Sequence, residues 1–490
     1  MRKPLAHPGI VVPGIALALG LCLALWHAIA LYATGLQATL PGRPERVISV
    51  STAAKTFIPY SDARPVVERL RQNLPAELMG KSPAELEAAW SGWVLRRDTA
   101  IRSRLERGDE DSVVHFWHYG TSFTTLPPVT ERNVARLGGA DAARVVDQRL
   151  DDLVSGMVSP GIDERLQFAR RVLERRGIDP VTPAGSAKAR EYLEAVRRRV
   201  LAEYEEHRRI LDSAQLLDPV TALAAYVTMF RDRGLSSDTS LLPSFAIEQA
   251  LETIKSQGLL GAGSVRRVAI VGPGLDFANK DDGYDFYPQQ TIQPFAIMDS
   301  LVRLGLARQD ELIVATFDLS PRVNQHLEAS LTRARAGDDY LVHLPLQGEE
   351  RWNPDFLAYW KRFGDRIGAE AEARAVPSMA GVIRIRAVRI RSAAVASIVP
   401  RDLNIVLERL EPLAANERFD LIVATNMLVY YDVFEQELAL ANIAAMLRQR
   451  GLFLSNTPVP PMPPMKMSDR YSTVSYSERH RDHLFWYERE

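Results

Sequence analysis

The chain has 490 residues and a formal net charge of -1 at pH 7. It is long enough for two globular domains, and its balanced charge gives no reason to expect nucleic acid or an acidic surface as a partner. The single cysteine, Cys22, excludes an intrachain disulfide.

The first predicted element is an apolar helix. Residues 10–35 contain no Lys, Arg, Asp or Glu, and the run reaches the roughly twenty residues needed to cross a bilayer. A signal peptide has a shorter apolar core, of about 7–15 residues, so the pattern favours an uncleaved transmembrane helix over a cleaved signal. Basic residues lie on both sides, in the flank 1–9 and in the linker 36–60, so the orientation stays open. We expect a single-pass protein of a bacterial cytoplasmic membrane.

Residues 61–261 predict a mostly helical domain rich in Arg and Glu. Residues 83–90 and 187–211 carry apolar residues at helical spacing with charged residues between them. The second segment is long and strongly charged, which favours a solvated bundle helix, with a dimer-forming coiled coil as the alternative. The stretch 115–124 is unusually aromatic, and we expect it to pack, in contact with the C-terminal domain. A metal bound by His115 and His118 is disfavoured because no nearby ligand completes the set.

The C-terminal domain, 262–490, is predicted to begin with a buried strand that ends in two glycines. Residues 268–271 are apolar, and Gly272 and Gly274 follow, which lets the backbone approach a ligand closely. The insertion 277–288 is rich in acids and aromatics and would overhang the ligand crevice. Tyr284 and Tyr287 are its candidate substrate contacts, although a surface loop held by its own aromatic residues is equally consistent.

A second predicted strand, 311–317, ends in Asp318, followed by Leu319. A carboxylate at the tip of a parallel strand can accept hydrogen bonds from ribose hydroxyls. The alternative is that Asp318 caps the following helix, because the sequence Asp-Leu-Ser-Pro also opens helices well.

The third core strand is less clear. Residues 340–344 and 382–390 both look strand-like, and only one of them can fill that place. Asp402 would be able to bond an adenine amino group if 382–390 is the third core strand, but we favour Asp402 as a cap of a helix over 405–410.

The segment 419–460 predicts a complete parallel crossover. Residues 419–424 are apolar and β-branched and stop at Thr425 and Asn426. An amphipathic helix follows, basic residues and Gly451 end it, and residues 452–456 start another strand.

This segment resembles the fourth to fifth strand region of class I S-adenosylmethionine (SAM) dependent methyltransferases. Within them it is most similar to the chemotaxis-receptor methyltransferases, although Thr425 replaces their arginine. The β-prone runs 471–476 and 483–487 resemble the antiparallel sixth and seventh strands of the family. The likeness implies a doubly wound α/β sheet of seven strands, SAM as cofactor and a methyl acceptor that the sequence does not identify. Together with the residues described above, the candidate cofactor residues are Gly272, Gly274, Asp318, Leu319, Asp402 and Asn426, and the candidate substrate residues are Tyr284, Tyr287, Asn426 and Tyr430.

No catalytic residue or metal ligand is assigned. Ile270 stands where the family pattern usually has an acid, and Asp276 stands where it has a third glycine. A catalytically inactive binding or scaffold protein on the outer side of the membrane is therefore the alternative function. A nicotinamide-binding domain is disfavoured because Phe277 occupies the third glycine position of the dinucleotide fingerprint.

Overall fold

The computed structural model describes residues 53–214, 230–231, 233–278, 285–348, 351–377, 383–478 and 480–490. All of them belong to one compact unit, Ser51–Glu490. The predicted membrane segment 10–35 and the flank 1–9 lie outside the described residues. Within the described ranges, no helix combines the length and the apolar character needed to cross a bilayer.

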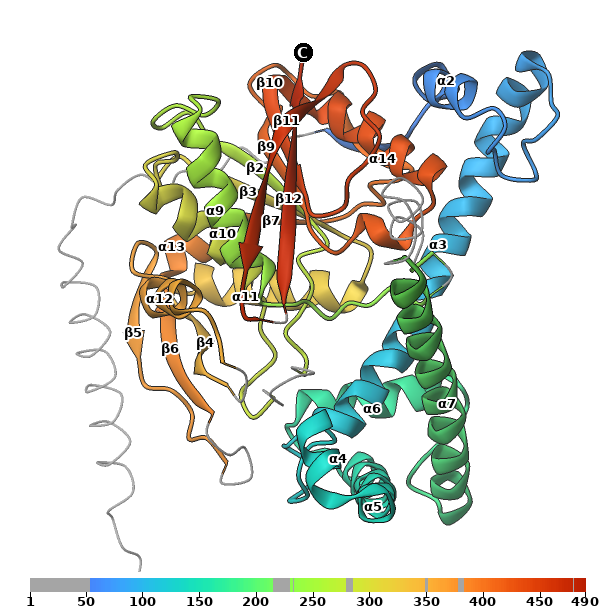
Figure 1. Ribbon diagram of the computed structural model, residues 1–490, viewed down its shortest axis with the longest axis vertical. Coiled ribbons are helices and arrows are strands. Elements are labelled where there is room, and N and C mark those ends of the chain that lie inside the picture. Colours follow the sequence, from blue (N-terminus) through green and yellow to red (C-terminus); the bar gives the residue numbers. More distant parts are fainter. Residues whose placement is uncertain are drawn as a thin grey trace, which may run out of the picture. The chain divides into compact units, whose positions relative to one another are not determined.

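A seven-stranded sheet forms the centre of this unit (Figure 1). In chain order its strands are β2 (Arg267–Val271), β3 (Ile313–Asp318), β7 (Ile398–Asp402), β9 (Phe419–Ala424), β10 (Leu447–Ser455), β11 (Met465–Ser475) and β12 (Arg481–Arg489). Their spatial order is β11-β12-β10-β9-β2-β3-β7. Strand β12 runs antiparallel to both of its neighbours, and β10, β9, β2, β3 and β7 are parallel. The predicted α/β sheet of seven strands, ending in an antiparallel hairpin, is confirmed.

Helices cover both faces of this sheet because its central strands are apolar on both sides. Val268 and Ile270 of β2 belong to one buried cluster with residues of α9 (Pro243–Ser256), α10 (Gln293–Arg303) and α11 (Pro321–Arg335). Ala269 and Val271 belong to a second cluster with residues of α14 (Val433–Met446), α2 (Tyr60–Arg69) and α3 (Pro83–Tyr119). The alternation of a β-strand thus assigns neighbouring residues to opposite layers.

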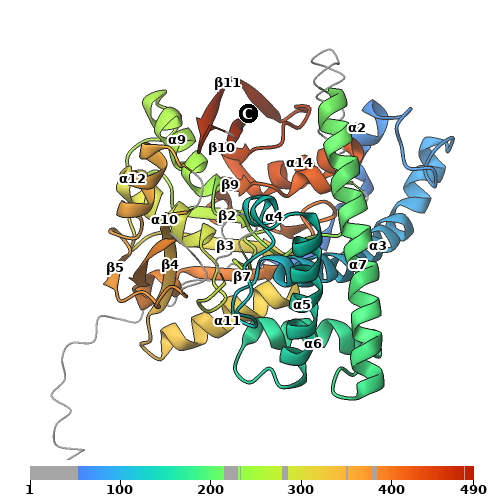
Figure 2. The same cartoon turned by 60° about the horizontal axis from the view of Figure 1, so that its bottom comes forward.

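The chain before the sheet forms a group of helices, as predicted. They are α3, α4 (Glu131–Leu137), α5 (Gly139–Val158), α6 (Glu164–Arg175) and α7 (Pro183–Ala214). Helix α3 begins with a capping box in which Ser82 and Glu85 satisfy each other's backbone N–H groups. Helix α7 contains the predicted 187–211 helix and packs on α3 and α5, so it is a member of the bundle (Figures 1 and 2).

The third core strand is β7, and neither candidate from the sequence fills that place. The candidates form β4 (Tyr340–Gln347) and β6 (Arg384–Ile390). Strand β6 pairs with β4 on one side and with β5 (Gly368–Ala371) on the other, in a separate antiparallel sheet beside α12 (Pro354–Arg362). Strand β6 carries arginines on both of its faces, Arg384 and Arg386 on one and Arg389 on the other, which does not suit a core strand covered by helices on both sides. The short helix α13 (Ser392–Val395) then leads into β7.

The helix expected over 405–410 is also absent. Those residues form a turn and then β8 (Glu408–Glu411), which pairs with β1 (Ala54–Phe57) in a two-stranded antiparallel sheet. The backbone N–H groups of Leu407 and Glu408 donate to the carbonyl of Asn404, which closes the turn. The end of the predicted linker is therefore a strand that pairs with the C-terminal half of the chain.

Candidate functional site

A cavity of about 370 Å³ lies at the carboxyl ends of β2, β3 and β9. Strands β3 and β9 flank β2 on opposite sides, so the direction in which strands are added to the sheet reverses at β2. The cavity therefore lies at the switch point where α/β sheets bind ligands. Its volume is within the range of small-molecule sites. The sheet contributes Val271, Gly272, Gly274, Asp276, Phe317, Asp318, Leu319, Thr425 and Asn426 to its lining.

Gly272 and Gly274 both adopt the left-handed backbone conformation, with φ of +66° and +61°. A Cβ atom on Gly272 would lie 3.0 Å from Cγ of Met427. A Cβ atom on Gly274 would lie 2.9 Å from Cβ of Thr239 and 3.0 Å from the carbonyl oxygen of Ser237. The predicted turn is present, and its glycines are required for close approach by other parts of the same chain.

Residues 234–241, which we call the strap, cross this glycine turn. The backbone N–H of Leu275 donates to the carbonyl of Ser237 at 2.8 Å, and that of Thr239 donates to the carbonyl of Leu275 at 2.9 Å. On its other side the strap contacts α3 at Gly108, where an added Cβ would lie 1.8 Å from the carbonyl oxygen of Leu235. Every residue of the strap lines the cavity, a role that no pattern in the sequence predicted.

Asp318 lies at the end of β3 as predicted and is only 8% exposed. Its carboxylate accepts a hydrogen bond from the N–H of Ser320 at 2.8 Å and another from the N–H of Gly274. Burial raises the pKa of Asp318 to about 6, against the opposing effect of these two donors. The side chain thus joins the glycine turn to the tip of β3, and the neighbouring Leu319 also lines the cavity.

Asp402 pairs in register with Asp318 on the adjacent strand but is not part of the cavity lining. Its side chain is half exposed and forms ion pairs with Arg102 at 2.8 Å and with Lys55 at 3.7 Å. The structure thus engages Asp402 with the N-terminal segment and away from the cavity.

Asn426 and Tyr430 line the cavity, as expected for residues after β9. Asn426 has a positive φ of 57° and exchanges two hydrogen bonds with Asn456, at 2.8 and 2.6 Å. Tyr430, in the short 3₁₀ helix η2 (Leu428–Tyr430), has its ring centroid 5.7 Å from that of Phe230. Burial raises the pKa of Tyr430, so its phenol stays protonated and can donate a hydrogen bond at neutral pH.

The insertion after the glycine turn docks on the helical group. Arg165 of α6 donates to the carbonyls of Phe277, Tyr287 and Asp276. The buried carboxylate of Asp285 accepts hydrogen bonds from the backbone N–H of Thr121, at 2.7 and 2.8 Å from its two oxygens.

Of the two tyrosines proposed in the insertion, Tyr284 lies outside the described residues. Tyr287 is buried and does not line the cavity. Its hydroxyl donates to Asp276 at 2.8 Å, and its ring stacks on that of His343. The arrangement around Tyr287 matches a loop held by its own aromatic residues.

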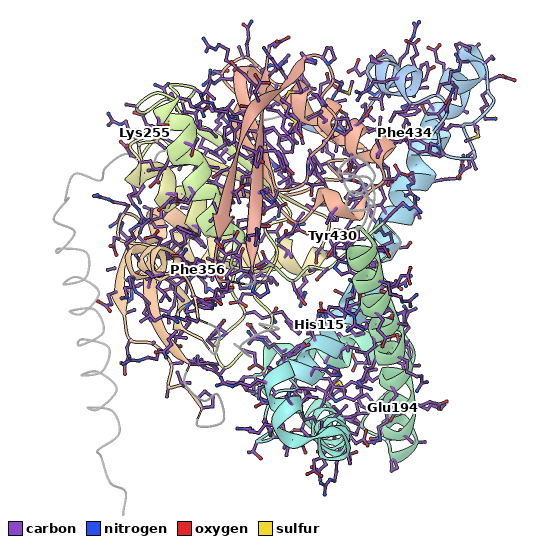
Figure 3. All side chains as sticks on the ribbon, in the orientation of Figure 1. His115, Glu194, Lys255, Phe356, Tyr430 and Phe434 are labelled. Carbon is purple, nitrogen blue, oxygen red and sulfur yellow. The ribbon has the colours of Figure 1, made fainter. Side chains whose placement is uncertain are left out.

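Helix α3 and the segment before the strap supply a third wall that sequence reasoning missed. Its members are Leu105, Asp111, His115, Phe230 and Arg233. Figure 3 labels His115, which belongs to α3 of the helical group, and Tyr430, which belongs to η2. The aromatic stretch was the one available signal, and its predicted contact with the C-terminal domain is confirmed because the rings of Phe116 and Phe277 lie 5.6 Å apart.

His118 does not line the cavity. Its Nε2 atom accepts a hydrogen bond from Nε of Arg197 at 2.8 Å, and burial lowers the pKa of His118 to about 3. In the part of the chain that the structure describes, no three His, Cys, Asp or Glu side chains are grouped so that they could hold a metal ion.

No family model matches the chain, and no curated protein matches it. Solved structures that resemble it include TrmN from Thermus thermophilus, at 11% identity and a TM-score of 0.24, over 51% of this chain and 52% of that one. Magnesium protoporphyrin IX methyltransferase from Synechocystis PCC 6803 matches at 9% identity and a TM-score of 0.25, over 56% of this chain and 98% of that one. The CurJ carbon methyltransferase matches at 12% identity and a TM-score of 0.24, over 87% of this chain and 99% of that one. The chain thus spans about half the length of TrmN, and the fold assignment rests on the strand order.

Proposed function

We propose that the protein is a SAM-dependent methyltransferase. The observation that carries the proposal is the cavity at the switch point of the seven-stranded sheet, where a glycine turn and a buried strand-end carboxylate meet. Asp318 would accept hydrogen bonds from the ribose hydroxyls, and the apolar side chains of Phe317, Leu319 and Leu403 would surround the adenine.

The residues present fit this cofactor. The cavity combines apolar walls with a few convergent polar groups, as small-molecule sites do. Two buried polar atoms of its lining, Oγ of Ser237 and Oδ2 of Asp238, have no hydrogen-bond partner among the described residues. Buried polar groups are almost always satisfied, so unpaired atoms that line a cavity favour a polar ligand there.

When bound, SAM supplies a methyl group on a good leaving group. The protein's task is then to align the acceptor and to exclude water. His115 and Asp111 line the wall on the helical side, and the ring of Tyr430 lies against Phe230 of that wall, so we assign the acceptor to that side of the cavity. Asp111 is paired with Arg199 at 2.6 Å and Tyr430 stays protonated, so we assign no general base and leave the acceptor unnamed.

From residues 10–35 we also propose that the enzyme is anchored in a bacterial cytoplasmic membrane by a single helix. The side on which the folded unit lies is the open part of this proposal. Reporter fusions to the C-terminus decide it, because an outer location would separate the site from cytosolic SAM.

The inactive binding protein remains a second candidate because of one specific observation. The strap bonds directly to the glycine turn, so part of the surface that the glycines were expected to offer a ligand is covered by the chain itself. In that case the cavity would hold a different ligand or a segment of a partner.

Calorimetric titration of SAM into the full-length protein in mild detergent tests the proposal. We expect saturable binding that weakens roughly ten- to hundredfold in Asp318→Ala, because the variant removes charge-assisted hydrogen bonds. Arg448 and Asp420 form an ion pair at the opposite end of the strands, so Arg448→Gln is a matched control and should bind like the wild type. A folded wild-type protein that does not bind SAM contradicts the proposal and favours the second candidate.

A further inference from the structure

The strap carries a buried carboxylate that is only half satisfied. The side chain of Asp238 is 5% exposed. Its Oδ1 accepts a hydrogen bond from Arg322 at 3.0 Å, whereas Oδ2 has no partner within the described part of the chain. Asp238 lines the cavity, and its backbone forms a bridge with Leu275 inside the glycine turn. An anionic acceptor is thereby held beside the turn.

Arg322 fixes the orientation of this carboxylate. Its guanidinium lies 4.1 Å from the ring centroid of Phe168 and 4.8 Å from that of Phe277, so one aromatic ring comes from α6 and the other from the insertion. Contacts of this kind hold a guanidinium in place. Because Arg322 engages Oδ1, the remaining acceptor of Asp238 has little freedom to find a partner elsewhere in the protein.

The other acids of the cavity have engaged carboxylates. Asp276 accepts hydrogen bonds from Tyr287 at 2.8 Å and from Gln290 at 2.9 Å. Asp111 is paired with Arg199, and Asp318 accepts from two backbone N–H groups. Among these acids, Asp238 is the one with a fully buried carboxylate oxygen that has no partner among the described residues. A buried carboxylate oxygen without a donor is costly, and a cationic N–H donor on the ligand relieves that cost most effectively.

We infer that Asp238 binds the ammonium group at the amino-acid end of SAM. The inference rests on the proposed function and adds a residue that lies outside the sheet. Ser237, whose buried Oγ also has no partner among the described residues, can donate its hydroxyl hydrogen to the carboxylate at the same end. The strap would thus recognise the charged end of the cofactor, while Asp318 holds its ribose. The helical part of the chain then completes the cofactor site as well as the acceptor site.

Three ligands that differ at this end test the assignment by calorimetry on the full-length protein. SAM has both a sulfonium and an ammonium group, S-adenosylhomocysteine keeps only the ammonium, and methylthioadenosine has neither. Asp238→Asn keeps the shape and an acceptor for Arg322, but it replaces the anionic oxygen. We expect SAM and S-adenosylhomocysteine each to bind roughly ten- to hundredfold more weakly to this variant, with methylthioadenosine unchanged.

Other patterns of binding overturn the inference in distinct ways. Equal weakening of all three ligands would mean a structural role, and a loss confined to SAM would place Asp238 at the sulfonium. No change for any ligand would leave Asp238 outside the site. A wild type that binds none of them would remove the proposed function itself. The matched control is Asp310→Asn, an exposed acid between α10 and β3, which should bind all three like the wild type.

A ligand-side measurement keeps the inference testable if Asp238→Asn does not fold. The deamino analogue of S-adenosylhomocysteine lacks only the ammonium group. The wild type should bind it roughly ten- to hundredfold more weakly than S-adenosylhomocysteine. Equal affinity for the two compounds would overturn the assignment.

Discussion

Asp318 combines a predicted ligand contact with an unfavourable environment for charge. Burial raises its pKa from an ordinary 3.8 to about 6. The folded protein therefore binds a proton at this site that the unfolded chain releases, and folding is favoured at low pH. The stabilising contribution of Asp318 is complete below about pH 3.8 and is lost as pH rises through 6. Over that window it amounts to about 3 kcal/mol of unfolding free energy.

The expected decrease in stability with rising pH gives a prediction for Asp318→Asn, whose side chain cannot titrate. The free energy of unfolding of the wild type, measured relative to that of the variant, should fall between about pH 4 and pH 6.5. Urea unfolding of both proteins at several pH values measures this difference. Other buried acids, such as Asp276 and Asp285, also have pKa values raised by burial, but their contributions are common to both proteins and drop out of the difference. A difference that does not depend on pH would show that Asp318 has an ordinary pKa.

The site residues that sequence could predict are those at the ends of strands. Gly272, Asp318 and Asn426 all follow apolar runs, and parallel strands bring such positions to one edge of a sheet. Asp238 and His115 have no such marker, because their position depends on how the helical part packs against the sheet. Asp402 is a strand end too, but an arginine from α3 engages it.

At the scale of elements, the strap is held where backbone meets backbone. At Gly108 of α3 there is no room for a side chain, because the carbonyl of Leu235 lies against it. At Gly234 of the strap there is none either, because the backbone of Gly108 lies against it. The strap should therefore respond to a single added methyl group on the helix.

We predict that Gly108→Ala displaces the strap. Alanine normally stabilises a helix by about 0.5–1 kcal/mol relative to glycine, but a Cβ at 1.8 Å from Leu235 should reverse the sign and lower stability by roughly 2 kcal/mol. Thermal unfolding and SAM titration measure the two expected losses. Gly92, exposed on the same helix, is the control, because its added Cβ would meet only the end of the Arg96 side chain and Gly92→Ala should raise the Tm. A higher Tm for both variants would mean that the strap is not clamped.

The choice of core strand shows where pattern reading fails at this scale. Residues 382–390 look strand-like, and β6 is a strand, but a strand-like pattern does not identify the sheet that the strand joins. The actual core strand β7 is five residues long and contains Pro400. It lies at the edge of the sheet, where proline is tolerated.

At the scale of the whole described unit, a few side chains join the helical group to the sheet. Arg165 is buried and donates hydrogen bonds to the carbonyl of Asp276 and to two carbonyls in the insertion. Helices α4 to α7 otherwise pack on one another and on α3, and α3 itself also packs against the sheet through the second buried cluster.

Arg165→Met should cost roughly 2–4 kcal/mol, because it keeps most of the volume but leaves buried carbonyls without a donor. Unfolding in urea, followed by circular dichroism, should lose cooperativity as the helical group separates from the sheet. The control Arg170→Met lies on the same helix and removes only a partly exposed pair with Glu174, so it should change stability by less than about 0.5 kcal/mol. Identical, fully cooperative transitions for both variants would mean that Arg165 does not couple the two parts.

The pairing of β1 with β8 has a consequence for synthesis on the ribosome. Phe57 pairs with Glu408, so roughly 350 residues must be made before the first described strand finds its partner. At about 5–20 residues per second this takes roughly 20–70 s. During that interval residues 54–57 leave the ribosome as an unpaired strand. The nascent chain must therefore wait, or be held by a chaperone, until most of the polypeptide has been translated.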